Sequence, residues 1–87
     1  MNMSLLWAVS QSKKLSPVER RVLESVVARA ADDGTFSVSH DRLVRSTELS
    51  LGTVRTTMLL LAMRGIVADT LTDRDGVPVL RVECDAL

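Results

Sequence analysis

The sequence has one cysteine, one histidine and four glycines among its 87 residues, and each scarcity excludes a class of site. Cys84 has no partner for an internal disulfide, which suits a reducing cytosol, and we expect it to be a small buried side chain near a strand end rather than a reactive thiol. A histidine-based metal site or catalytic triad would lack its other members, because His40 stands alone. No glycine-rich motif for a phosphate or a dinucleotide occurs. We therefore predict no metal, no cofactor and no enzymatic activity.

The chain also lacks net charge and long apolar runs. Eleven basic and eleven acidic side chains cancel, whereas a domain attracted to nucleic acid over long distances usually carries a basic excess. The apolar run at 58–63 is far shorter than the ~20 residues that cross a bilayer, and the first fourteen residues do not resemble a secretory signal. With 46% hydrophobic and 25% charged residues, the composition is that of one small globular domain, and we expect a cytoplasmic protein.

Two helices are expected in the first third of the chain. A short one covers residues 3–12, where apolar side chains recur at near-helical spacing. The second begins at Pro17, because Ser16 is placed as its N-cap and Glu19 completes a capping box. We expect Gly34 to stop this second helix. Its buried stripe consists of Val22, Leu23, Val26, Val27 and Ala30.

The middle of the chain predicts a strand and two more helices. The run of β-formers at 35–39 is long enough for one short strand. Ser39 is placed to cap a helix over 40–46 that buries Leu43 and Val44. After a break at 47–50, Ser50 is placed to cap a helix over 51–64, and Gly65 ends it. Two short helices joined by a tight turn form a helix-turn-helix unit.

The last part of the chain has the pattern of a β-hairpin. Residues 66–72 and 77–84 flank a DRDG segment in which Gly76 can adopt the positive φ of a tight turn. Pro78 has no N–H for a strand ladder, so it belongs on a sheet edge or at a strand start. We interpret Asp69, Asp73 and Asp75 as turn formers, because the spacing of a calcium loop is not met. The predicted α+β order is helix, helix, strand, helix, helix, hairpin.

These elements resemble the winged helix-turn-helix domain of bacterial and phage DNA-binding regulators and replication initiators. The resemblance covers Ser16 to about Cys84 and depends on the order of short motifs: DDGTFSVS, Leu43, Leu49–Ser50, Thr53–Val54, Leu61, and GIV before the hairpin. It implies a three-helix core with a short strand and a C-terminal hairpin wing at 16–87, preceded by a helical segment at 1–15 for docking or dimerisation.

The resemblance further implies a double-stranded DNA-binding protein, acting as a small dimeric transcriptional regulator or as a replication or partition factor. In that family the helix after the turn enters the major groove and the wing reaches the neighbouring backbone or minor groove. Arg42, Arg45 and His40 would then contact phosphates, and Arg74 would stand at the wing tip. The reading face would consist of Ser50, Gly52, Thr53, Arg55 and Thr56.

The helix over 51–64 carries more apolar side chains than one buried stripe needs. That stripe is predicted to contain Leu51, Val54, Met58 and Leu61. Leu59, Leu60 and Met63 fall outside it, and a cover is expected, since burying such a side chain contributes roughly 1.5–3 kcal/mol. Three covers are open: a second copy, a different protein, or the N-terminal segment with Leu5, Leu6, Trp7 and Val9. The alternative function is accordingly a protein-interaction adapter on the same scaffold.

Overall fold

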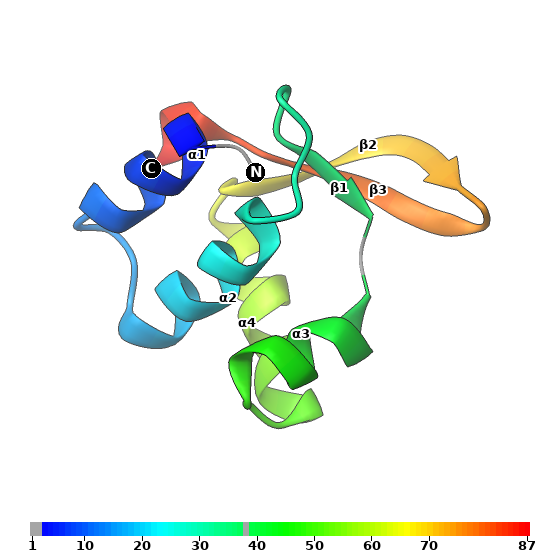
Figure 1. The fold of residues 1–87 in the computed structure, drawn as a ribbon, viewed down its shortest axis with the longest axis horizontal. Helices are drawn as coiled ribbons and strands as arrows, with labels where there is room; N and C mark the ends of the chain where they lie inside the picture. The colour runs from blue at the N-terminus through cyan, green and yellow to red at the C-terminus, as the bar shows by residue number, and fades with distance from the viewer. Residues whose placement is uncertain (1–2, 38) are drawn as a thin grey trace.

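The computed structural model describes residues 3–37 and 39–87, and these form an α+β fold (Figure 1). The order of its elements confirms the predicted one. Among the described residues the helices are α1 (Met3–Gln11), α2 (Pro17–Val27), α3 (His40–Thr47) and α4 (Leu51–Met63). The strands are β1 (Thr35–Ser37), β2 (Val67–Arg74) and β3 (Val77–Val82), and a 3-10 turn, η1 (Cys84–Ala86), follows them.

The predicted caps start three of the helices. The Ser16 hydroxyl accepts a hydrogen bond from the Glu19 N–H at 3.2 Å, and the Glu19 carboxylate accepts one from the Ser16 N–H at 2.8 Å. This capping box satisfies two backbone donors at the start of α2 that have no partner inside the helix. Ser39 and Ser50 cap α3 and α4 in the simpler way, each accepting from the N–H three residues further along.

Two glycines were predicted to end helices, and the prediction is confirmed for Gly65 and wrong for Gly34. Gly65 has a φ of +75° and follows α4 directly, as predicted. Gly34 does not stop α2, which already ends at Val27. It lies instead in the turn before β1 with a φ of +83°, and an added Cβ would lie 3.1 Å from the carbonyl oxygen of Val82. Gly34 is therefore required by the close approach of β3. Val38, in the predicted strand over 35–39, lies outside the described residues.

The sheet is antiparallel with the order β1-β3-β2. Within the described residues β1 pairs with residues 79–81 of β3, so Pro78, the second residue of β3, precedes the part of the strand that pairs on both sides. The prediction for Pro78 is confirmed. The β2–β3 hairpin extends past the helices at one end of the sheet, while α1 and the C-terminus lie at the other end (Figure 1).

Aspartates shape the hairpin at two places. Asp75 and Gly76 form the turn with φ values of 53° and 78°. Nearer the base, Thr70 and Leu71 form a bulge, and the Asp69 carboxylate accepts a hydrogen bond from the Leu71 N–H at 2.8 Å. The interpretation as turn formers is confirmed for Asp75 only. Asp69 bonds at a bulge within β2, and Asp73 is a strand residue that pairs with Pro78.

A single apolar core lies between the helices and the sheet. All five predicted stripe residues of α2 are buried in it, and α4 contributes Val54, Met58 and Leu61. Leu51, also predicted in that stripe, is instead exposed, because it lies in the first turn of α4 and the buried stripe begins only at Val54. In α3, Leu43 is buried and Val44 is partly buried against the core.

The N-terminal helix belongs to this core. Leu5 and Val9 are buried, so the assignment of Leu5 to an external interface is wrong: its side chain faces the core rather than solvent. Leu6 is half-buried and Trp7 is exposed. The guanidinium group of Arg20 on α2 donates to three backbone carbonyl groups at and just after the end of α1. The acceptors are Val9 at 2.7 Å, Ser10 at 2.9 Å and Ser12 at 2.7 Å.

Cys84 is exposed, which contradicts the predicted burial. The prediction extended the last strand to Cys84. β3 ends at Val82, so Cys84 falls in η1, beyond the last buried side chain of the strand.

An ion pair joins α2 to the end of α4. The Arg64 guanidinium donates to both oxygens of the Glu19 carboxylate at 2.7 Å, and it also donates to the Lys14 carbonyl. Burial raises the pKa of Glu19, but hydrogen bonds from the Ser16 N–H and from Arg64, with the positive charge of Arg64, together lower it below its ordinary value of 4.5.

The pKa of Glu19 predicts acid sensitivity. Because its folded-state pKa lies below the unfolded value, the stabilisation is present above pH 4.5 and is lost as pH falls through the folded-state pKa. Urea unfolding of wild type and Glu19→Gln at pH 7, 5, 4 and 3 measures this effect. We expect the stability difference between the two proteins to narrow as pH falls. A constant difference would contradict the prediction.

Arg20 is predicted to hold α1 in place. Arg20→Ala leaves three carbonyl groups without their donor and should destabilise the protein by about 1.5–3 kcal/mol, since hydrogen bonds to charged groups contribute that much each at best and the group is only partly buried. Chemical unfolding gives the total loss. Amide hydrogen exchange should show faster exchange in α1 than in α4, and equal acceleration in both helices would contradict a local role.

Candidate nucleic-acid interface

The connection between α3 and α4 is short and internally bonded. Residues 48–50 join the helices, with Glu48 in the left-handed region at a φ of 62°. The buried Thr47 hydroxyl donates to the Leu43 carbonyl and accepts from the Leu49 N–H at 3.3 Å. These contacts determine the direction in which α4 leaves the turn.

The amino half of α4 is open to solvent over the predicted reading face. Ser50, Gly52, Arg55 and Thr56 are exposed, and a Cβ added to Gly52 would meet no atom within 4 Å. Thr53 is half-buried, and its hydroxyl accepts a hydrogen bond from the Ser50 hydroxyl at 2.8 Å. A flat or convex partner can therefore approach this turn closely, with Arg55 as its cation.

The remaining predicted contact residues do not form one surface with these. Arg42 and Arg74 line a pocket beside α2 and β1, whereas His40 lines a groove beside α4 together with Arg55. Arg45 is exposed near the end of α3 and lines neither of the two. The predicted contact residues thus lie at two hollows, with Arg45 outside both.

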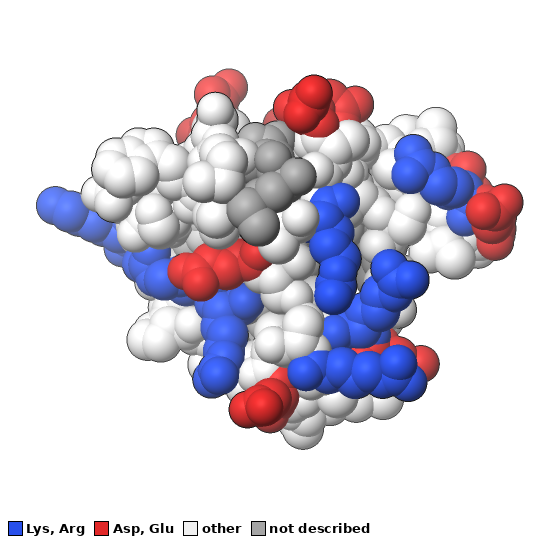
Figure 2. Space-filling view, viewed as in Figure 1, with Lys and Arg blue, Asp and Glu red and all other residues white. Residues whose placement is uncertain are grey.

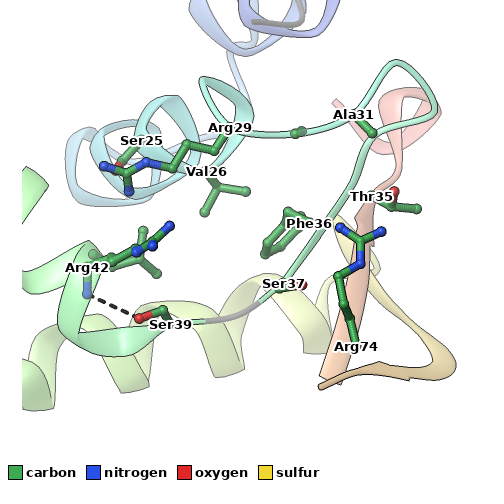
Figure 3. Close-up of a pocket in the computed structure, with 12 residues that line it drawn as sticks. Ser25, Val26, Arg29, Ala31, Thr35, Phe36, Ser37, Ser39, Arg42 and Arg74 are labelled. Atoms are coloured by element: carbon green, nitrogen blue, oxygen red, sulfur yellow. Dashed lines mark hydrogen bonds between the residues drawn. The ribbon is translucent and has the colours of Figure 1, made fainter. Parts of the chain in front are cut away.

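The first hollow, which we call the arginine pocket, has a volume of about 340 Å³. It is lined by Arg29 from the turn after α2, Arg42 from α3 and Arg74 from the end of β2. Figure 3 shows Arg29 and Arg42 on one side of the Phe36 ring and Arg74 on the other. Arg29 was not predicted as a site residue. The sequence around it does not indicate that this part of the chain lies near Arg74, more than forty residues further along.

The cations of this region are not neutralised within the described part of the chain. The ion pairs found there are Arg64 with Glu19 and Arg81 with Glu83. Neither uses an arginine of the pocket or Arg55. Figure 2 shows basic side chains beside α3 and the hairpin, acidic ones beside α3, at the hairpin tip and above β1, and further basic side chains on the side of α1 and α2. The protein has no net charge, but its surface charge is unevenly placed.

The second hollow, which we call the apolar groove, lies between α4 and the hairpin and has a volume of about 610 Å³. Leu59 is 61% exposed and lines it, and Met63 and Leu60 on the same helix are 74% and 46% exposed. The predicted apolar patch is therefore present. The lining residues are His40, Arg55, Met58, Leu59, Ala62, Val67, Asp69, Pro78 and Leu80.

The N-terminal segment does not cover this patch. α1 packs against α2, and its buried side chains Leu5 and Val9 are used there. In the described residues the intramolecular cover is thus wrong, since Leu59, Leu60 and Met63 stay exposed with α1 in place. A second copy and a different protein are the covers that stay open.

Comparisons of the chain with protein-family models, curated proteins and solved structures gave no match. Among the described residues no helix has the length and apolar character to span a membrane. The two hollows and the open end of α4 are the surface features that bear on function.

Proposed function

We propose that this chain is a winged helix-turn-helix protein that binds double-stranded DNA. In this proposal α3 and α4 form the helix-turn-helix, the amino half of α4 enters the major groove, and the β2–β3 hairpin is the wing. Its role would be that of a small regulator of transcription or a replication or partition factor in the cytoplasm of a bacterium or in a phage-infected cell.

The exposed amino half of α4 is the observation that carries the proposal. Gly52 allows a close backbone approach, Thr56 can donate or accept, and Arg55 has no ion-pair partner among the described residues. An arginine in this position can donate two hydrogen bonds to O6 and N7 of guanine. The hairpin projects beyond the helices, as a wing must to reach the duplex backbone (Figure 1).

The neutral net charge sets a condition on this binding. Attraction at long range is small, so affinity must come from cations that meet phosphates at close contact. Arg42, Arg45 and Arg74 are exposed cations on α3 and β2 that can do so. We therefore expect binding to be detectable first at low salt.

Arg55 is the residue whose removal tests base reading. Arg55→Ala should weaken binding to a duplex selected from a random library by about 1–3 kcal/mol, because a bidentate contact to a base is lost. Fluorescence anisotropy at low salt measures the loss. Arg21→Ala is the matched control, since Arg21 is also an exposed arginine but lies on α2 and is expected to leave affinity unchanged.

Two results would count against the proposal. If no duplex is retained at low salt, the DNA-binding function fails. If a duplex is retained and Arg55→Ala binds it as wild type does, α4 does not read bases through Arg55.

The apolar groove and the exposed leucines of α4 favour an association that accompanies or replaces DNA binding. We propose a homodimer as the partner state, because a symmetric pair reading a palindromic site is the usual arrangement of helix-turn-helix proteins. A protein-interaction adapter is the second candidate, and the same exposed Leu59, Leu60 and Met63 support it.

Leu59→Glu separates these states. In a dimer that buries Leu59 the charge should weaken association by more than ~1.4 kcal/mol, a tenfold change in the dissociation constant. Sedimentation equilibrium of wild type and variant measures it, with Arg21→Glu as an exposed control on α2. A monomeric wild type would contradict the homodimer. If the wild type also retains no duplex at low salt, the result favours the adapter.

A further inference from the structure

We propose that the arginine pocket is a binding site for a phosphate group. Arg29, Arg42 and Arg74 come from three separate parts of the chain, the turn after α2, helix α3 and strand β2, and they line one concave surface (Figure 3). Arginine binds phosphate through two parallel N–H donors, so a hollow lined by three arginines offers a phosphate group several donors of this kind. From the sequence, Arg42 was predicted to contact a phosphate and Arg74 to stand at the wing tip, whereas in the fold both line one hollow.

The composition of the pocket favours an anion. Among the described residues that line it there is no aspartate or glutamate. The three guanidinium groups have no ion pair or hydrogen bond with another described residue, so a ligand need not displace an internal partner. Arg29 was not recognised in the sequence, and it is the residue that distinguishes a pocket from two isolated surface cations.

A hydroxyl group adds a donor of suitable placement. The Ser39 oxygen accepts from the Arg42 N–H at 3.4 Å as the cap of α3, which leaves its own hydrogen free to be donated to a phosphate oxygen. The floor is apolar, because Val26 and Phe36 also line the pocket and are buried. A surface of low polarity behind the ligand strengthens the attraction between its charge and the arginines.

The volume of about 340 Å³ admits a phosphate with part of the group that it is attached to. Two sources supply this chemistry: the backbone of a duplex, or a free phosphorylated small molecule. The duplex source rests on the proposed DNA-binding function, while the small-molecule source does not. The chemistry of recognition is the same for both.

Titration of the ¹⁵N-labelled protein with sodium phosphate, at ionic strength held constant with sodium chloride, tests the site. We expect the Nε–Hε resonances of Arg29, Arg42 and Arg74 and the Ser39 amide to shift together and to saturate with one dissociation constant. Arg29→Gln should raise this dissociation constant about three- to tenfold. Arg21→Gln, the control outside the pocket, should not change it. Shifts that do not saturate, or that are equal at Arg21 and Arg81, would overturn the proposal, as would an unchanged constant in Arg29→Gln.

Two further titrations identify the source. A deoxynucleoside 5′-monophosphate that shifts the same resonances and binds more tightly than phosphate supports a free ligand. A duplex that competes with phosphate for these resonances supports the DNA backbone, and Arg29→Gln should then lower the slope of log affinity against log salt by about 0.9. If phosphate saturates the pocket but no duplex binds, the pocket proposal stands and the DNA proposal fails. If a duplex binds while Arg29→Gln changes neither the phosphate constant nor the slope, the pocket proposal fails and DNA binding stands.

Discussion

The contact between Arg64 and Glu19 determines how α4 is presented. It joins Arg64, the C-cap of α4, to the capping box that starts α2. Arg64 also donates to the carbonyl of Lys14, which lies in the segment between α1 and α2. The helix is thus held by polar contacts at its carboxyl end and by Val54, Met58 and Leu61 along its buried stripe. Its first turn is connected to α3 by residues 48–50 and packs through Val54. The opposite side of α4 is left exposed, and there Arg55 and Leu59 line the apolar groove.

The positions of the charged side chains matter more in this protein than its net charge, which is zero. The two ion pairs of the described residues use Arg64 and Arg81, and the arginines around α3 and the hairpin are left for an external partner. Screening limits their influence to roughly 10 Å at 0.1 M salt, so a partner must first approach by another route and is then held locally. A chain with zero net charge can bind phosphate under these conditions only if several cations meet one group, as the arginine pocket allows.

The two candidate surfaces of α4 are not independent. Arg55 belongs to the exposed amino half and also lines the apolar groove, together with Leu59 one turn further along. A protein that fills the groove would lie against Arg55 and compete with a duplex for it. A dimer that covers only Leu60 and Met63 would leave Arg55 accessible. The choice between an adapter and a DNA-binding dimer therefore depends on how much of the groove the partner occupies.

Features that depend on neighbours in sequence were predictable. Ser16, Ser39 and Ser50 were identified as caps because each bonds to an N–H three residues away, and the α2 stripe followed from helical spacing alone. The open face around Gly52 and Arg55 was also predicted, since the polar residues of α4 are confined to its first half.

Features that depend on contacts between segments far apart in the sequence were not predictable. Burial of Leu5, exposure of Cys84 and the position of Gly34 away from the end of α2 all depend on which elements pack together. Arg29 became a candidate site residue only when the turn after α2 was seen beside the hairpin. The sequence by itself determined where the helices and strands begin, because caps and turns are local interactions. Tertiary packing alone decided which surfaces these elements share, because that is a property of segments far apart in the chain.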